Sequence, residues 1–343
     1  MEPAVEILTV DLPTSPPSVS LPGRRKRGLS WLSDFHFAGG RVQVFDTGAD
    51  LKLDKILIGE ALVWLAFHLA VRTRSWALAP FRRGGARIWF TPHCPRPWYL
   101  IWSAMAWAGL RVARSPQEAD AVFAFEDATW SAPPAAPSHL AAYNFGCPDI
   151  SKSRVAAVFE TVFGYPLALD PALSVGPVVE KAELNGAHDG GILACPAPRR
   201  PGRHYQRLID TSDGRFTHDL RTPCIGGRPV AVFLKRKPKD ARFSIHNLGV
   251  TLQRPDQVYS PTEMGLIERF LAVMGIDWAG LDILRDRSSG LIYIVDVNKT
   301  DVGPIIALPF ADKLRSTALM ARALKAMILD GQASGTLGPR HKA

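Results

Sequence analysis

The segment GLIYIVDVNKTDVGP, residues 290–304, joins a run of β-branched and aromatic residues to a cluster of polar ones. Strand alternation would put the even-numbered residues from Ile292 to Asn298 on one face, so that an apolar stripe ends in Asp296 and an amide. A carboxylate at the buried end of a strand destabilises the fold unless a lysine, a turn amide or a metal ion pairs with it. The segment therefore predicts a strand that carries a binding group at its end.

A second strand, GLDILRD at residues 280–286, precedes this segment, and RSSG joins the two into a hairpin. Opposed residues of an antiparallel pair have a constant index sum, so a loop centred on Ser289 places Asp282 opposite Asp296. Asn298 adds a third oxygen on the same face. Two carboxylates and an amide fit Mg²⁺ or Mn²⁺ carrying nucleotide phosphates, and a pair of salt-bridged turn acids is the alternative interpretation.

The composition is that of an ordinary soluble protein of two to three domains, with 343 residues, 47% hydrophobic and 21% charged. A formal net charge of +9 suits phosphates or acidic substrates, but also nucleic acid or an anionic membrane. The four cysteines form no C-x-x-C pair, and the N-terminus does not have the pattern of a signal peptide. We therefore expect a reducing, cytoplasmic location and no zinc or disulfide framework.

Two N-terminal segments stand apart in composition. Residues 1–28 are rich in Pro and Ser and end in the basic cluster at 24–27, which indicates a flexible arm and favours a solvated tail over a lipid- or nucleic-acid-binding one. Residues 54–74 form an apolar segment that we expect to be a buried or interface helix. A membrane-surface helix is the alternative, because Trp64, Phe67 and flanking basic residues would suit one.

The middle of the chain alternates between strand and helix patterns. The runs ARIWF and ADAVFAFED flank a segment of helical length that ends in Gly109, which predicts a parallel α/β domain. A helix is then expected from the N-cap Ser151 to Gly164. β-like runs with intervening turns over 177–237 predict an antiparallel sheet. Further helices are expected from the capping box that begins at Ser260 and over about 311–330.

Taken in order, the pieces over residues 149–304 resemble an ATP-grasp domain. The resemblance implies an α/β and α+β fold, in which a parallel α/β domain precedes a two-subdomain ATP-grasp fold with ATP between the subdomains. The expected divisions are a flexible arm at 1–28, an N-terminal domain at 29–148, a small subdomain at 149–212, a large subdomain with a C-terminal helix at 213–331, and a tail at 332–343.

The resemblance also implies roles for individual residues. ATP would be held by two lysines, a glycine-rich loop, a hinge and an Asp-x-Arg strand, namely Lys152, Lys181, Gly186, Gly190, Gly191, Gln206, Arg207, Leu208, Asp210, Asp219 and Arg221. Lys235 or Arg236 would lie near the γ-phosphate, and Arg242 and Asn247 would contact the acceptor or the phosphate. The metal would be held by Asp282, Asp296 and Asn298. Of the neighbours Lys235 and Arg236, we expect Arg236 to face the cleft, because its fork of donors matches phosphate oxygens.

Two departures from the family pattern keep more than one function in view. The metal motif is Asp296-x-Asn298 where Glu-x-Asn is common in the family, and Asp-x-Asn occurs in some family kinases that act on inositol phosphates. The segment NKTDVGP also lacks the serine-rich turn of many family ligases; Thr300 and Asp301 occupy that stretch, and Asp301 has no assigned role. We expect an ATP-dependent carboxylate–amine or carboxylate–thiol ligase that forms an acylphosphate. A small-molecule kinase and a non-catalytic nucleotide-binding protein are the alternatives. The expected partners are ATP and a small-molecule or peptide acceptor, without nucleic acid; peripheral membrane contact and a dimer stay open.

Overall fold

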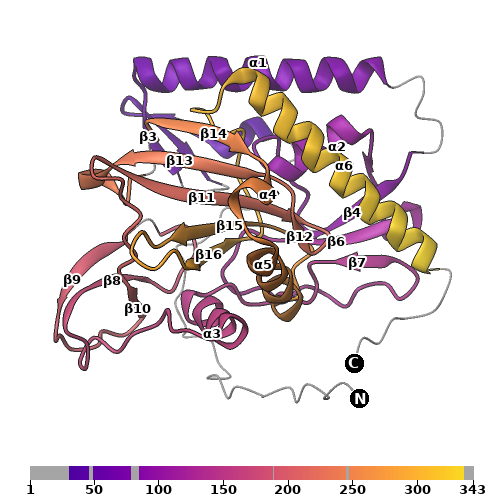
Figure 1. Cartoon of the computed structure of the whole chain (residues 1–343). Helices are drawn as coiled ribbons and strands as arrows, with labels where there is room; N and C mark the ends of the chain where they lie inside the picture. The colour runs from indigo at the N-terminus through magenta and orange to yellow at the C-terminus, as the bar shows by residue number, and fades with distance from the viewer. Residues whose placement is uncertain (1–30, 46–48, 79–84, 188, 245–246, 336–343) are drawn as a thin grey trace, which may run out of the picture.

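The structure is a computed structural model, shown in Figure 1, that describes residues 31–45, 49–78, 85–187, 189–244 and 247–335. The arm predicted at 1–28, His188 of the glycine-rich loop and the tail from 336 onward lie outside the described residues. The first described elements are a 3₁₀ helix and a small antiparallel sheet with the strand order β1-β2-β3. Their bounds are Trp31–Asp34 for the 3₁₀ helix, Phe35–Ala38 (β1), Arg41–Val44 (β2) and Ala49–Lys52 (β3).

Helix α1, Lys55–Ala77, follows the small N-terminal sheet and lies along one edge of the molecule (Figure 1). Asp54 caps its N-terminus by accepting hydrogen bonds from the backbone N–H groups of Ile56 and Leu57, each at 3.0 Å. Phe67 and Val71 are buried against the rest of the protein, but the opposite face is exposed. The burial expected for α1 is therefore confirmed for one face only, and the exposed face excludes a fully buried helix.

A four-stranded parallel sheet forms the N-terminal α/β domain, with the order β5-β4-β6-β7. Ile88 and Phe123, on its two central strands, are fully buried, as expected for a parallel sheet covered on both faces. Helix α2 ends where Gly109 adopts a φ of 79°. The predicted parallel domain is confirmed. Its elements are β4 (Arg87–Pro92), α2 (Leu100–Ala108), β5 (Arg111–Val112), a 3₁₀ turn (Pro116–Glu118), β6 (Ala121–Phe125) and β7 (Ala141–Tyr143).

A three-stranded antiparallel sheet, here called the small sheet, has the order β10-β8-β9. Its strands are β8 (Gly176–Ala182), β9 (Gly191–Cys195) and β10 (Arg203–Arg207). Helix α3, Lys152–Phe163, precedes the small sheet and runs between the predicted caps Ser151 and Gly164. The apolar face of α3 packs on helix α5 and strand β16 of the larger sheet rather than on the small sheet.

A six-stranded antiparallel sheet, here called the large sheet, has the order β14-β13-β11-β15-β16, and β12 pairs with β11. The predicted capping box of α5 is present, since Ser260 and Glu263 bond each other's backbone N–H groups. The elements are β11 (Phe216–Ile225), β12 (Arg228–Pro229), β13 (Val232–Pro238), a 3₁₀ turn (Lys239–Ala241), β14 (Gly249–Gln253), α4 (Pro255–Val258), α5 (Pro261–Met274), β15 (Trp278–Arg285), β16 (Ile292–Asn298) and α6 (Phe310–Gly335).

Two apolar cores hold these layers together. One joins α3 and α5 to the large sheet. The other joins the parallel sheet to α6 and also takes in Ile225 and Trp278 of the large sheet. Hydrogen bonds of Asn144 with the backbone of Asp277 and Trp278, at 2.8–2.9 Å, reinforce this second junction. No described residue of β8, β9 or β10 belongs to a buried apolar cluster, so the small sheet is attached mainly through polar contacts and its connecting segments.

Candidate nucleotide site

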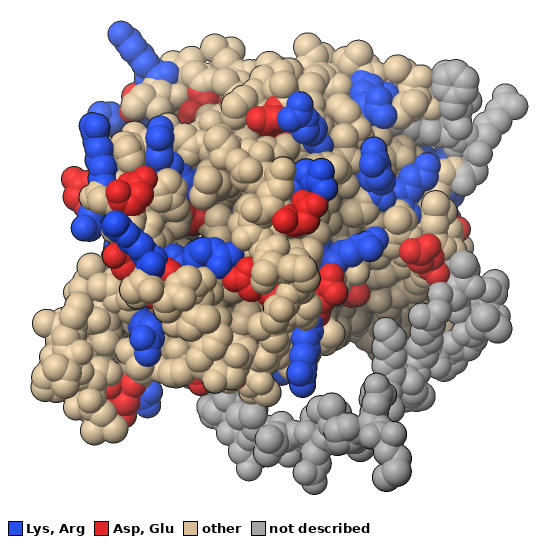
Figure 2. All heavy atoms as spheres, viewed as in Figure 1, with Lys and Arg blue, Asp and Glu red and all other residues tan. Residues whose placement is uncertain are grey.

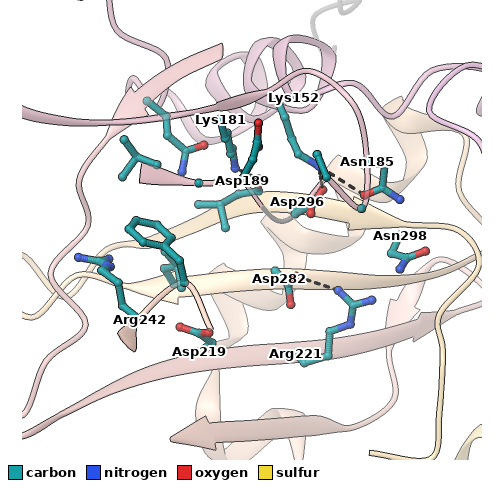
Figure 3. Close-up of a pocket in the computed structure, with 18 of the residues that line it drawn as sticks. Lys152, Lys181, Asn185, Asp189, Asp219, Arg221, Arg242, Asp282, Asp296 and Asn298 are labelled. Atoms are coloured by element: carbon teal, nitrogen blue, oxygen red, sulfur yellow. Dashed lines mark hydrogen bonds and ion pairs between the residues drawn. The ribbon is translucent and has the colours of Figure 1, made fainter. Parts of the chain in front are cut away.

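A cleft of about 440 Å³ lies between the small sheet and the large sheet (Figure 3). Most of the predicted site residues line it, from both sheets and from the start of α3: Lys152, Lys181, Gly186, Gly190, Gln206, Arg207, Asp219, Arg221, Lys235, Arg242, Asp282, Asp296 and Asn298. The size and the mixed polar and apolar lining suit a nucleotide-sized ligand. The fold thus brings together residues that are up to 146 positions apart in the chain, 298 − 152.

Five predicted residues do not line this cleft: Gly191, Leu208, Asp210, Arg236 and Asn247. Asp210 instead accepts a hydrogen bond from the backbone N–H of Ser212 at 2.9 Å, which is a turn-capping contact. At the hinge, the buried Ile209 lines the cleft where Leu208 does not. Gly190 lines the cleft, and its backbone lies close to the ring of Phe243, since a Cβ at this position would be 3.1 Å from that ring.

The β15–β16 hairpin places Asp282 directly opposite Asp296, as its spacing predicts. The predicted face is wrong further along the strand, because the register shifts by one residue between Ile283 and Asp282. Val295 is the extra residue, so Ile294 pairs with Ile283 on the buried face while Asp296 turns to the cleft. The bulge therefore removes the cost of a carboxylate on an apolar face, which the regular alternation had implied.

The two opposed acids are held by separate cations. Asp296 forms an ion pair with Lys152, and Asp282 pairs with Nη1 of Arg221 at 2.9 Å and lies 3.8 Å from Nζ of Lys235 (Figure 3). Burial by itself would raise the pKa of Asp282, but the charges of Arg221 and Lys235 hold it well below its ordinary value. Both acids thus face the cleft next to cationic side chains, whose positive charges offset the repulsion between the two carboxylates.

Asp301, which had no role at the level of sequence, completes the environment of Arg221. Its Oδ1 accepts from Nη2 of Arg221 at 2.7 Å, and both side chains are buried. Gly280 makes room for this pair, because a Cβ there would lie 2.7 Å from Nε of Arg221 and would also clash with the Asp301 carboxylate. The position of Asp301 depends on how the chain turns after β16, and residue spacing does not specify that turn.

Strand β13 presents Lys235, not Arg236, to the cleft. Lys235 lies opposite Asp219 in the β11–β13 ladder and beside Asp282, whereas the exposed Arg236 has its guanidinium carbon 4.7 Å over the ring of Phe216. The expectation that Arg236 points inward is therefore wrong. Alternation also brings Lys237 to the cleft, where its Nζ contacts Asp219 at 2.8 Å. Lys237 was missed, although its two-residue spacing from Lys235 was a usable signal.

Lys181 is a half-buried cation on β8, the central strand of the small sheet. Its Nζ donates to the backbone oxygen of Val295 at 2.8 Å, so that it bridges the two sheets. Burial lowers the pKa of Lys181 to about 8, although Asp296 acts in the opposite direction. Desolvation thus makes the ammonium less stable in the ligand-free protein than in water.

This desolvation predicts a pH dependence of stability. Because the folded pKa of about 8 lies below the roughly 10.4 of a solvated lysine, the unfolded chain binds more protons within that window. The free energy of unfolding contributed by Lys181 should therefore rise as the pH increases from about 8 toward 10. Urea unfolding of the parent and of Lys181→Met at a series of pH values would measure it. If the free energies of unfolding of the parent and of Lys181→Met changed equally with pH across this window, the prediction would be wrong.

The oxygen donors at the hairpin fit a hard divalent cation. Oδ1 of Asp282 is buried and has no hydrogen-bond partner among the described residues, and the carboxylate of Asp296 and the amide of Asn298 share its face. No group of three or more His, Cys, Asp and Glu side chains suited to a metal occurs in the described part of the chain. Such a cation would therefore take further oxygens from water and from phosphate, as Mg²⁺ ordinarily does.

The chain was compared with known families, sequences and structures. No family model matches it, and no curated protein matches it. Its fold is similar to the ATP-grasp ligase PsnB bound to a precursor peptide and AMPPNP (12% identity over 71% of this chain and 98% of that chain, TM-score 0.47). It is also similar to the D-alanine–D-alanine ligase of Bacillus anthracis (10%, 73% and 98%, 0.43) and to an L-amino acid ligase of Bacillus licheniformis (12%, 75% and 78%, 0.40).

These similarities concern the arrangement of the backbone. In another PsnB complex, the match spans 62% of that chain and 55% of this one, at 15% identity. The predicted fold class, a parallel α/β domain followed by two antiparallel sheets around a cleft, is confirmed by the topology of this chain itself.

Proposed function

We propose that this protein is an ATP-dependent ligase of the ATP-grasp type, which joins a carboxylate to an amine or a thiol. The observation that carries the proposal is the charge pattern of the cleft. Cations from three separate elements, with Lys181 on β8, Arg221 on β11 and Lys235 on β13, converge on the two opposed carboxylates of the β15–β16 hairpin. A polyanion that carries a divalent cation would satisfy both sets of charges at once.

The proposed reaction needs no nucleophilic side chain. A substrate carboxylate oxygen attacks the γ-phosphorus of ATP, and the bond between that phosphorus and the β,γ-bridging oxygen breaks. ADP departs, and the substrate carboxylate becomes an acylphosphate. The amine or thiol then attacks the acyl carbon, the carbon–oxygen bond breaks, phosphate departs, and the nucleophile loses its proton to solvent. In such transfers the protein acts by positioning the reactants and neutralising their charge.

The cleft residues divide this work between binding and transfer. Lys152 and Lys181 would hold the nucleotide phosphates, and Lys235 would stabilise the charge that develops on the transferring group. A cation held by Asp282, Asp296 and Asn298 would supply further neutralisation of the phosphate oxygens. Arg242, whose Nη2 donates to the backbone oxygen of Ile209 at 2.8 Å, also lines the cleft and would contact the acceptor.

A kinase that phosphorylates a hydroxyl is the second candidate, and the shorter acid Asp296 in the metal motif favours it. Trapping the intermediate separates the two. A ligase supplied with ATP, a carboxylate and hydroxylamine forms a hydroxamate, because hydroxylamine captures the acylphosphate, whereas a kinase forms a stable phosphate ester of an alcohol. A panel of small carboxylates, peptides and polyols, followed by ADP release and product mass, would decide between them. ADP release with alcohols alone would reject the ligase.

The two phosphate-binding lysines give a direct test of nucleotide binding. Lys152→Ala and Lys181→Ala should each weaken ATP binding by about 1.5–3 kcal/mol, because each removes a charge-assisted contact to phosphate. The change in ATP affinity should exceed the change in ligand-free stability. Calorimetric titration measures the first and thermal unfolding the second. Lys325→Ala, on the exposed side of α6, is the matched control. Unchanged ATP affinity in both cleft variants would rule out this cradle.

A further inference from the structure

The solvent face of α1 carries an apolar stripe, here called the α1 stripe. It consists of Ile58, Leu62, Leu65, Leu69 and Trp76. These positions are four, three, four and seven residues apart, which is the spacing of one helix face. Each side chain is 52–64% exposed. An exposed row of large apolar side chains of this length marks an interaction surface rather than ordinary surface.

A shallow apolar groove of about 620 Å³ adjoins the α1 stripe. Leu69 belongs to both, and the groove ends at Trp107 of α2, over whose ring the guanidinium carbon of Arg74 lies at 4.5 Å. The other residues that line the groove are Ala66, Ala70, Thr73, Ala77 and Leu78. The groove thus combines an apolar floor with a cation at its rim, a pairing that matches an acyl chain below an anionic headgroup.

The charges around the stripe have one dominant sign. Within α1, Lys55, Arg72 and Arg74 are exposed, and Glu60 is the single acid of the helix. Figure 2 shows the upper edge of the molecule, where α1 lies, as mostly uncharged with basic side chains near both ends. This arrangement is complementary to an anionic surface. It opposes a symmetric contact with a second copy, because such a contact would bring the cations of two α1 helices together.

The other face of α1 is fastened to the protein. Phe67 and Val71 are fully buried, and Nε2 of His68 lies 2.6 Å from the backbone oxygen of Pro97, which is outside the helix. By length and composition α1 is the one described helix that could cross a membrane. Crossing would require these buried contacts to break, whereas lying flat on a bilayer would keep them.

We propose that the α1 stripe and its groove dock the protein on an anionic lipid surface, with α1 lying parallel to the bilayer. The stripe enters the boundary between headgroups and acyl chains, and the flanking cations contact acidic headgroups. Figure 1 shows α1 on the edge of the molecule away from β8, β9 and β10, so the nucleotide cleft stays open to solvent in this orientation. The proposal is independent of the reaction in the cleft.

Vesicle flotation of the full chain tests the proposal. The protein should float with vesicles of phosphatidylcholine and phosphatidylserine and much less with phosphatidylcholine alone. The triple variant Leu62→Gln, Leu65→Gln, Leu69→Gln should lower the partition coefficient by at least roughly tenfold, because three apolar side chains are lost from the bilayer contact. Replacing Lys55 and Arg72 with Gln should remove most of the preference for phosphatidylserine.

The test has one control and three contrary outcomes. Leu173→Gln, at a position 84% exposed and remote from α1 in the sequence, should bind vesicles as the parent does. The leucine variants should keep the parent melting temperature, since only exposed side chains change, whereas replacing Arg72 also removes its contact with the ring of Trp102 at 5.0 Å. A parent chain that fails to float, or a triple variant that floats as well as the parent, would overturn the proposal. A dimer in sedimentation that the triple variant dissociates, without vesicle binding, would assign the stripe to a second copy instead.

Discussion

Asp282→Asn and Asp296→Asn are each expected to reduce ATP turnover to below roughly one hundredth of the parent rate. Each substitution keeps the shape of the side chain but removes an anionic oxygen that a nucleotide-bound cation would use. The fold should survive both changes, because the neighbouring cations keep other partners. Arg221 still pairs with Asp301 at 2.7 Å, and Lys152 still lies 3.4 Å from Oδ1 of Asn185.

Steady-state ADP release at saturating Mg²⁺ and ATP measures this effect, and circular dichroism checks the fold. Asp50→Asn is the control, because Asp50 forms an exposed ion pair with Arg41 at 2.9 Å, far from the cleft. That variant should turn over at the parent rate. If both hairpin variants kept parent turnover, the hairpin would not hold the cation, and the two acids would serve only as partners of Arg221, Lys235 and Lys152.

Lys235→Met should lower kcat by roughly tenfold to a thousandfold while changing the KM for ATP much less. Burial lowers the pKa of Lys235, against the opposing effect of Asp282, which indicates a desolvated position in the cleft. A cation there interacts most strongly with the charge that develops during phosphoryl transfer. The neighbouring change Arg236→Met should be nearly silent, because the Arg236 side chain is exposed and stacks on Phe216.

These two substitutions form a matched pair on one strand, since each replaces a long cation with methionine. Steady-state kinetics with ATP as the varied substrate separates kcat from KM. A large loss in Arg236→Met together with a silent Lys235→Met would show that β13 presents its other face to the phosphates. If both were silent, the strand would not serve the transferring phosphate, and Lys237 would become the next residue to test.

The sequence predicted those parts of the fold that local signals specify. The capping box at Ser260 and the left-handed glycines Gly109 and Gly164 set helix ends through contacts within a few residues. In both cases the information lies within a short segment of chain. The pairing of Asp282 with Asp296 was also predicted, but the turn alone does not produce it, because the pairs next to the turn follow a register shorter by one residue and the bulge at Val295 restores the predicted pair.

The features that were missed depend on contacts between distant segments. The bulge at Val295 has no mark in the strand pattern, because Ile294 and Val295 are both apolar. The inward position of Lys235 follows from its pairing with β11, since the residues before it are apolar on both faces. In α1, leucines occupy one face and Phe67 and Val71 the other. Because both faces are apolar, the composition did not reveal which of them packs against the rest of the protein.

The small sheet has a consequence for how nucleotide affinity should be understood. Its buried apolar residues, among them Val178 and Tyr205, join no described core shared with the rest of the protein, and Lys181 reaches the large sheet through a single hydrogen bond. A bond of this kind contributes only about 0.5–1.5 kcal/mol in competition with water. Bound phosphates would then connect the small sheet to the large sheet, which are otherwise joined by few contacts. The free energy of ATP binding, obtained from a measured Kd, would therefore be the contribution of the contacts to the ligand minus the cost of bringing the two sheets together.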